Sequence, residues 1–173
     1  MQNYIVIFAI PKKVEKNIRS AYETTFNKSV PISNLHLTLL PPFSFVKKEG
    51  LVLLKESLKK LKDIAITASL YSPNLFRNPG ETILYLPVNP EKEITKVHDK
   101  LELLLKDIIK LETSLYHTDE VPPFLAHISL DYNFTFNSKT LNTLEINLEK
   151  MNFKLTKPIL MTQNTLGKWK VVN

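Results

Sequence analysis

The chain has 173 residues, of which 43% are hydrophobic, and both figures suit one globular domain. It contains no cysteine, which excludes disulfides, thiol catalysis, iron–sulfur clusters and cysteine-ligated zinc. The formal net charge is +6, and all of it arises in the first half of the chain. Residues 1–90 carry 12 basic and 6 acidic residues, whereas residues 91–173 carry 11 of each. A cationic half of this kind favours a polyanionic partner.

The first half predicts two strand–helix pairs and a long third strand. Its elements are, in chain order, a strand over 4–10, an amphipathic helix opened by Pro11, a loop containing Pro31, a strand over 35–40 ended by Pro41-Pro42, a helix over 51–61, a strand over 64–75 and a turn at 78–80. The buried face of the first helix is predicted from apolar residues at helical spacing, namely Val14, Ile18, Ala21 and Tyr22.

The apolar run at the N-terminus does not look like an export signal. No basic residue precedes Tyr4–Ile10, and the run stops at Pro11. No apolar run elsewhere approaches the roughly 20 residues that a membrane helix needs. We therefore expect a cytoplasmic protein with no membrane partner. For the oligomeric state, a monomer is the default expectation.

The second half repeats the order of the first. It predicts a strand over 82–88, a helix opened by Pro90, a loop containing Pro122-Pro123, a strand over 124–132, a helix over 138–150 and two short strands within 159–172 around Gly167. Both halves thus run through strand, proline, amphipathic helix, proline-containing loop and a strand that carries a histidine. This shared order indicates a pseudo-duplication.

The alternation of strands and helices predicts an α+β fold. We expect one domain over residues 1–173, with two pseudo-duplicated lobes whose antiparallel-rich sheets form a central cleft and whose helices cover the outer faces. A doubly wound nucleotide fold is disfavoured, because the only three glycines, Gly50, Gly80 and Gly167, form neither a G-x-G-x-x-G nor a G-x-x-x-x-G-K phosphate loop.

Two matching four-residue motifs carry the chemical signal. They are His36-Leu37-Thr38-Leu39 and His127-Ile128-Ser129-Leu130, each with the order histidine, apolar, hydroxyl, apolar. Because side chains alternate across a strand, His36 shares one face with Thr38, and His127 shares one face with Ser129. Two such strands brought together by pseudo-symmetry would surround one cleft with two imidazoles and two hydroxyls.

This pair of H-x-[ST]-x motifs, 127 − 36 = 91 positions apart, resembles the signature of the 2H phosphoesterase superfamily, which includes the bacterial 2′-5′ RNA ligases, or RNA 2′,3′-cyclic phosphodiesterases. The resemblance covers nearly the whole chain, from Ile10-Pro11 through residues 36–43 and 124–130 to residues 165–169. Two departures are visible: Ala126 stands where proline often precedes the second motif, and Asp131-Tyr132 stand where some ligase-type members carry arginine.

The resemblance implies hydrolysis of a 2′,3′-cyclic phosphate to a 2′-phosphate, and ligation as the reverse reaction. Two imidazoles with ordinary pKa values near 6.5 can hold opposite protonation states at neutral pH, so one serves as base and the other as acid. The spacing does not decide between them, and we favour His127 as the base and His36 as the acid. The Thr38 and Ser129 hydroxyls would donate hydrogen bonds to the phosphate oxygens.

The remaining expectations concern binding residues and cofactors. Phe43 and Tyr132 follow the two motifs and are our candidates for stacking on a base. We expect no metal and no other cofactor, because the histidines and carboxylates show no ligand spacing. His98 is interpreted as a helix boundary residue and His117 as a surface-loop residue.

Two alternative functions stay open at this stage. One is a catalytically idle module that binds a nucleotide or RNA in the same cleft. The other is the same chemistry on a different cyclic or 2′-5′-linked nucleotide. The lysines of residues 47–62 could follow an RNA backbone or simply face solvent.

Overall fold

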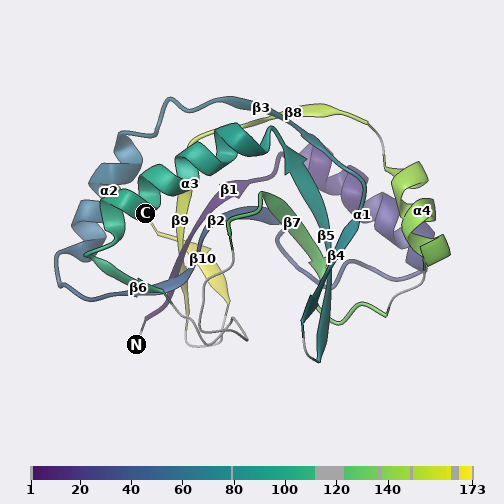
Figure 1. The fold of residues 1–173 in the computed structure, drawn as a ribbon, viewed down its shortest axis with the longest axis horizontal. Helices are drawn as coiled ribbons and strands as arrows, with labels where there is room; N and C mark the ends of the chain where they lie inside the picture. Colours follow the sequence, from purple (N-terminus) through teal and green to yellow (C-terminus); the bar gives the residue numbers. More distant parts are fainter. Residues whose placement is uncertain are drawn as a thin grey trace.

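The structure is a computed structural model that describes residues 2–78, 80–111, 123–135, 138–148, 150–164 and 168–172 (Figure 1). Within these residues the elements follow the order β1 (Tyr4–Ala9), α1 (Lys12–Phe26), β2 (His36–Phe45), α2 (Gly50–Lys59), β3 (Ile66–Leu70), β4 (Asn74–Asn78), β5 (Glu81–Asn89), α3 (Glu91–Leu105), β6 (Ile109–Leu111), β7 (His127–Asp131), α4 (Ser138–Asn147), β8 (Asn152–Leu155), β9 (Ile159–Gln163) and β10 (Trp169–Val171). The predicted α+β class is confirmed.

The described strands form two five-stranded antiparallel sheets. The first has the order β10-β9-β1-β2-β6, with β1 at its centre. In the second, β5 is central: β7 pairs with one of its edges, β4 and then β3 pair with the other, and β8 pairs with β3. The two histidine motifs therefore lie on different sheets, as expected for two lobes around a cleft.

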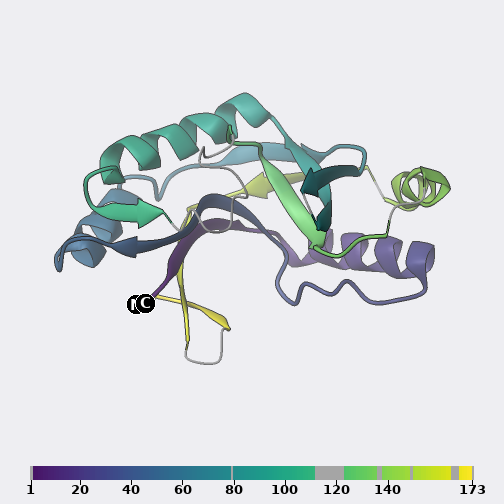
Figure 2. The ribbon, with the colours of Figure 1, turned by 60° about the horizontal axis from the view of Figure 1, so that its bottom comes forward.

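The helices are exchanged between the lobes. Helix α3 follows β5 of the second sheet but packs against β2 of the first, beside α2. Helix α1 follows β1 of the first sheet, yet its Tyr22 hydroxyl reaches Asp131 of β7 in the second, and its far end lies beside α4 (Figures 1 and 2). One continuous cluster of buried residues consequently includes side chains from both sheets and all four described helices.

The amphipathic pattern predicted the buried face of the first helix. Val14, Ile18, Ala21 and Tyr22 are the buried residues of α1, as predicted. Helix α1 begins directly after Pro11, and helix α3 begins directly after Pro90. No described helix has the length and apolar character needed to cross a membrane.

The observed strands differ from the predicted ones in several places. Strand β2 continues through Pro41-Pro42 to Phe45, because the two prolines lie in a bulge where Ile5 faces two residues instead of one. The strand predicted over 64–75 is interrupted at residues 71–73 and becomes β3 and β4. Strands β6 and β8 were not predicted; the three residues of β6 pair with the extension of β2 beyond the bulge, and β8 pairs with β3.

Candidate active site

The two motifs occupy equivalent places in the two sheets. In the first sheet His36 is paired with Ala9 and Thr38 with Ile7, on the strand that leads into α1. In the second sheet His127 is paired with Pro87 and Ser129 with Tyr85, on the strand that leads into α3. Each motif strand is thus the antiparallel neighbour of the strand before its helix. The two halves therefore share the same strand pairing around their motifs, as the predicted pseudo-duplication requires.

Both imidazoles are held in the same way by the chain just before them. His36 Nδ1 lies 2.8 Å from the carbonyl oxygen of Asn34, and His127 Nδ1 lies 2.7 Å from that of Leu125. A carbonyl can only accept, so each Nδ1 carries the proton and donates it. In the neutral ring this fixes Nε2 as the unprotonated nitrogen. The two Nε2 atoms are therefore available to accept a proton.

Burial shapes the protonation of both rings. It lowers the pKa of His36, and the hydrogen bond to Asn34 only partly offsets this effect. The pKa of His127 is lowered by burial as well, is raised in part by the Leu125 carbonyl, and is lowered again by the positive charge of His36. Because the repulsion between two charged rings is mutual, protonation of one imidazole disfavours protonation of the other.

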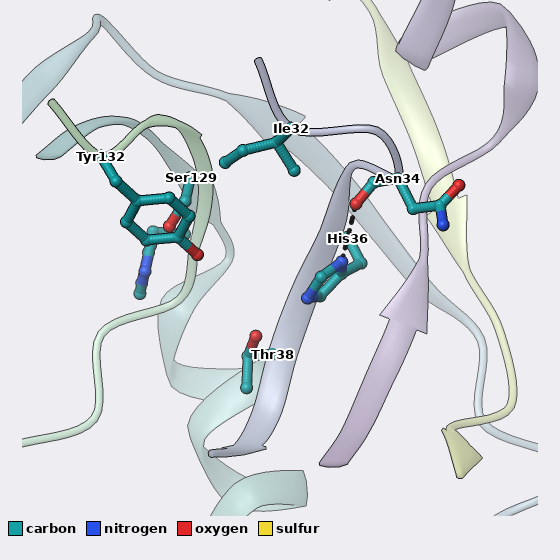
Figure 3. Close-up of a pocket in the computed structure, with 7 residues that line it drawn as sticks. Ile32, Asn34, His36, Thr38, Ser129 and Tyr132 are labelled. Atoms are coloured by element: carbon teal, nitrogen blue, oxygen red, sulfur yellow. Dashed lines mark hydrogen bonds between the residues drawn. The ribbon is translucent and has the colours of Figure 1, made fainter. Parts of the chain in front are cut away.

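All four motif residues line one pocket. Its walls are formed by Ile32, Asn34, His36, Thr38, His127, Ser129 and Tyr132. Figure 3 shows Thr38 and His36 along β2, with Ser129 and Tyr132 across from them. Within the described part of the chain no hydrogen bond occupies the Thr38 or Ser129 hydroxyl, so both are available to a ligand.

Of the two aromatic candidates, Tyr132 lies at the pocket and Phe43 does not. The Tyr132 side chain lines the pocket and is 47% exposed, which leaves its ring accessible. Phe43 is fully buried and packs against Tyr4 and Phe45, so the expectation that it stacks on a base is wrong. Proximity in sequence to the first motif was a poor guide, because Phe43 is paired with Tyr4 of β1 and both side chains lie in the core.

Sequence reasoning missed two rings that frame His127. Phe76 and Tyr85 stack on one another with centroids 4.0 Å apart, and both meet the His127 ring edge-on, at 5.0 Å and 5.4 Å. The sequence held a signal for Tyr85, because it stands between Leu84 and Leu86 and so faces the opposite side of the strand from these two leucines. In the structure both leucines are buried, and Tyr85 is paired with Ser129 of the second motif.

The other two histidines lie apart from the pocket lining or outside the described residues. His98 on α3 is a boundary residue, as interpreted from the sequence, with its side chain 14% exposed. His117 lies outside the described residues. Among the described residues, one group has side chains close enough to hold a cation, namely His98 with the exposed Asp99 and Glu102; none of the three lines the pocket.

The same fold is found in solved structures of low sequence similarity. The chain matches E. coli LigT without ligand at 15% identity and a TM-score of 0.66, over 99% of this chain and 93% of LigT. It matches TT0787 of Thermus thermophilus at 17% identity and a TM-score of 0.68, over 100% and 96% of the two chains. A third match, a phosphoesterase, has 16% identity and a TM-score of 0.67, over 99% and 94%.

These matches establish that the chain has the LigT fold over its whole length. E. coli LigT has also been crystallised with phosphate, with 3′-AMP, with ATP and with NADP⁺. No protein-family model and no curated protein sequence matches the chain.

Proposed function

We propose that this chain is a phosphoesterase of the 2H type that opens 2′,3′-cyclic phosphates of RNA ends or nucleotides without a metal and leaves 2′-phosphates. The observation that carries the proposal is one pocket with two imidazoles, each fixed through Nδ1, and two unoccupied hydroxyls. The fold supports it, because LigT has been crystallised with phosphate and with adenine nucleotides.

The two imidazoles divide the proton transfers. His127 accepts a proton from water at Nε2 as the water oxygen attacks phosphorus, and His36 donates a proton from Nε2 to the departing 3′-oxygen. The new P–O bond to water and the broken P–O3′ bond leave the phosphate on the 2′-oxygen.

The substrate itself supplies the required protonation state. Burial lowers the pKa of both rings, so both are mainly neutral at pH 7 in the free protein. A cyclic phosphate carries one negative charge, and an anion beside an imidazole raises its pKa. Binding therefore promotes protonation of His36 just where a proton donor is needed.

The two hydroxyls stabilise the charge that develops on phosphorus. Thr38 and Ser129 would each donate a hydrogen bond to a non-bridging oxygen, one from each lobe. Tyr132, at the rim, would stack on the base of the terminal nucleotide. With an RNA 5′-hydroxyl in place of water as the incoming group, the same proton transfers and the same departure of the 3′-oxygen form a 2′-5′ bond.

The test is turnover of 2′,3′-cyclic AMP in the presence of EDTA, with the product identified as 2′-AMP or 3′-AMP. We expect 2′-AMP, and a loss of about 10²–10⁴ in kcat for His36→Ala and for His127→Ala, the range for removal of one general acid or base. Thr38→Val and Ser129→Ala should each lower kcat by about 10²–10³, as for loss of one oxyanion donor.

Two further variants separate binding from chemistry. Tyr132→Ala should raise KM while changing kcat little, whereas Phe43→Leu, which alters only the core, should leave both close to wild type. Binding of the cyclic nucleotide without turnover would contradict the proposal and favour the idle binding module. Turnover that survives both histidine substitutions would contradict the mechanism.

A further inference from the structure

We propose that Arg19 and His98 are an equivalent pair of positioning residues, one for each imidazole. Each would hold the backbone segment whose carbonyl fixes the tautomer of a motif histidine. The consequence for catalysis rests on the proposed function, but the effect on the two rings does not.

The two residues occupy the same position in the duplicated unit. Helices α1 and α3 both have 15 residues, begin after a proline, and carry Arg19 and His98 as their eighth residue, since 19 − 12 = 98 − 91 = 7. Each side chain reaches the residue three places before its motif histidine. For Arg19 that residue is Ser33, since 36 − 3 = 33. For His98 it is Phe124, since 127 − 3 = 124.

Arg19 fastens the segment before His36 by hydrogen bonds to its backbone. Its Nη2 donates to the carbonyl oxygens of Ile32 and Ser33 at 3.0 Å and 2.6 Å. The next residue is Asn34, whose carbonyl accepts the His36 Nδ1 proton. Glu15, one turn earlier on α1, holds the guanidinium through Oε1 at 2.7 Å from Nη2. The arginine is thus fixed to its own helix and bound to the loop at the same time.

His98 fastens the segment before His127 by stacking. Its ring lies on the ring of Phe124 with centroids 4.2 Å apart and planes 12° apart. The next residue is Leu125, whose carbonyl accepts the His127 Nδ1 proton. The same imidazole donates from Nδ1 to the Leu39 carbonyl at 2.7 Å, within the first motif. His98 therefore joins the two motif-bearing strands.

Arg19 and His98 are equivalent in position and in the segment that each one holds, but they use different interactions. Arg19 uses ionic hydrogen bonds to two carbonyls, whereas His98 uses a ring stack and one hydrogen bond. Both act one residue away from the carbonyl that orients an imidazole. A rotation of that carbonyl would release Nδ1 and admit the other tautomer, which places a proton on Nε2 where the base needs a lone pair.

The proposal predicts effects that are specific to one ring. Long-range ¹H–¹⁵N spectra recorded across a pH titration report the tautomer and pKa of His36 and His127 separately. Arg19→Met should bring in the Nε2-protonated tautomer of His36 and leave His127 unchanged. His98→Leu, which removes both the stack and the hydrogen bond, should do the reverse. The exposed residues Lys16 and Lys100 supply controls: Lys16→Met and Lys100→Met remove charge from the same helices and should change neither ring.

A milder variant covers the case in which Arg19→Met fails to fold. Glu15→Gln keeps the guanidinium but weakens its anchor, so we expect a smaller shift at His36 alone. In cyclic nucleotide turnover, Arg19→Met and His98→Leu should lower kcat on the order of tenfold to 100-fold, the cost of misplacing a catalytic group, with a smaller change in KM.

Two results would overturn the proposal: unchanged tautomers in both variants, or equal perturbation of both rings by either one. A wild-type protein that turns over nothing, yet shows the ring-specific shifts, would refute the proposed function and leave the positioning pair intact.

Discussion

The two imidazoles of the pocket are held by the same local hydrogen bond. Each donates Nδ1–H to the carbonyl two residues earlier, and each has its pKa lowered mainly by burial. The first feature sets which nitrogen faces the substrate, and the second sets the pH range in which the ring gains a proton. In the proposed mechanism, the two features together allow two identical side chains to take different roles once a phosphate is bound.

These lowered pKa values predict the pH dependence of the reaction. In the proposed mechanism the productive form of the free protein has His36 protonated and His127 neutral, and both pKa values lie below the ordinary 6.5. The profile of kcat/KM should therefore peak below pH 6.5 and fall about tenfold per pH unit well above the pKa of the acid. The kcat profile should peak at higher pH, because the bound phosphate raises the pKa of His36. A kcat/KM maximum above pH 7 would contradict this reading.

At the residue scale, the alternation of side chains along a strand gave correct predictions, whereas closeness in sequence to a motif gave a wrong one. His36, Thr38, His127 and Ser129 line one pocket because residues two apart share a strand face. Phe43 was chosen because it follows the first motif, and it lies in the core. The Asn34 and Leu125 carbonyls could not be predicted, since they are backbone groups whose direction depends on loop geometry.

At the scale of elements, the end of β2 depends on close packing against α2. The extension of β2 past the Pro41-Pro42 bulge brings Phe45 against the first residue of α2, Gly50. A Cβ on Gly50 would lie 2.8 Å from Phe45 Cγ and 3.1 Å from Ile108 Cγ2. The sequence predicted the helix but not this contact, because the prolines suggested that the strand had already ended.

This contact predicts the effect of Gly50→Ala. Alanine favours a helix, but the clash with Phe45 should dominate and lower the free energy of unfolding by about 1–3 kcal/mol, the usual cost of overpacking. Urea denaturation measures the change. The cost should shrink when Gly50→Ala is combined with Phe45→Ala, which removes the opposing ring. Equal costs in the two backgrounds would show that the contact is not responsible, and cyclic nucleotide turnover should be unaffected.

At the scale of the whole molecule, the lobes are tied together by helices that cross from one sheet to the other. The amphipathic pattern correctly identified the buried face of α1, but a pattern shows only that a face is apolar, not which sheet covers it. Tyr22 of that face donates to Asp131 at 2.7 Å, at the end of the strand that carries the second motif. The sequence therefore predicted which residues of α1 are buried, but it could not predict that this helix packs against the other lobe.

Asp131 is the polar centre of this junction. It is 5% exposed, and besides the Tyr22 hydroxyl it accepts hydrogen bonds from Lys28 Nζ at 3.0 Å and from the Asn133 backbone N–H at 3.1 Å. Burial alone would raise the pKa of Asp131, but the hydrogen bonds and the charge of Lys28 outweigh it and leave the pKa below its ordinary 3.8. The carboxylate thus links α1, the loop after it and β7.

The lowered pKa makes the junction dependent on pH in a definite direction. The folded protein binds the Asp131 proton more weakly than the unfolded chain, so the stabilisation is complete above pH 3.8 and is lost as the pH falls through the folded pKa. Asp131→Asn removes the charge and leaves one acceptor oxygen in place of two, so it can no longer accept from both the Tyr22 hydroxyl and the Asn133 N–H; it should cost about 1–3 kcal/mol at pH 7.

The difference in unfolding free energy between wild type and Asp131→Asn should therefore be largest near neutral pH and should shrink below about pH 4. Urea denaturation at a series of pH values measures it. Lys28→Met is the matched control: its side chain is 54% exposed, so loss of its charge should cost under about 1 kcal/mol. A pH-independent difference for Asp131→Asn would mean that packing, rather than the buried charge, holds the second motif strand to the helix of the other lobe.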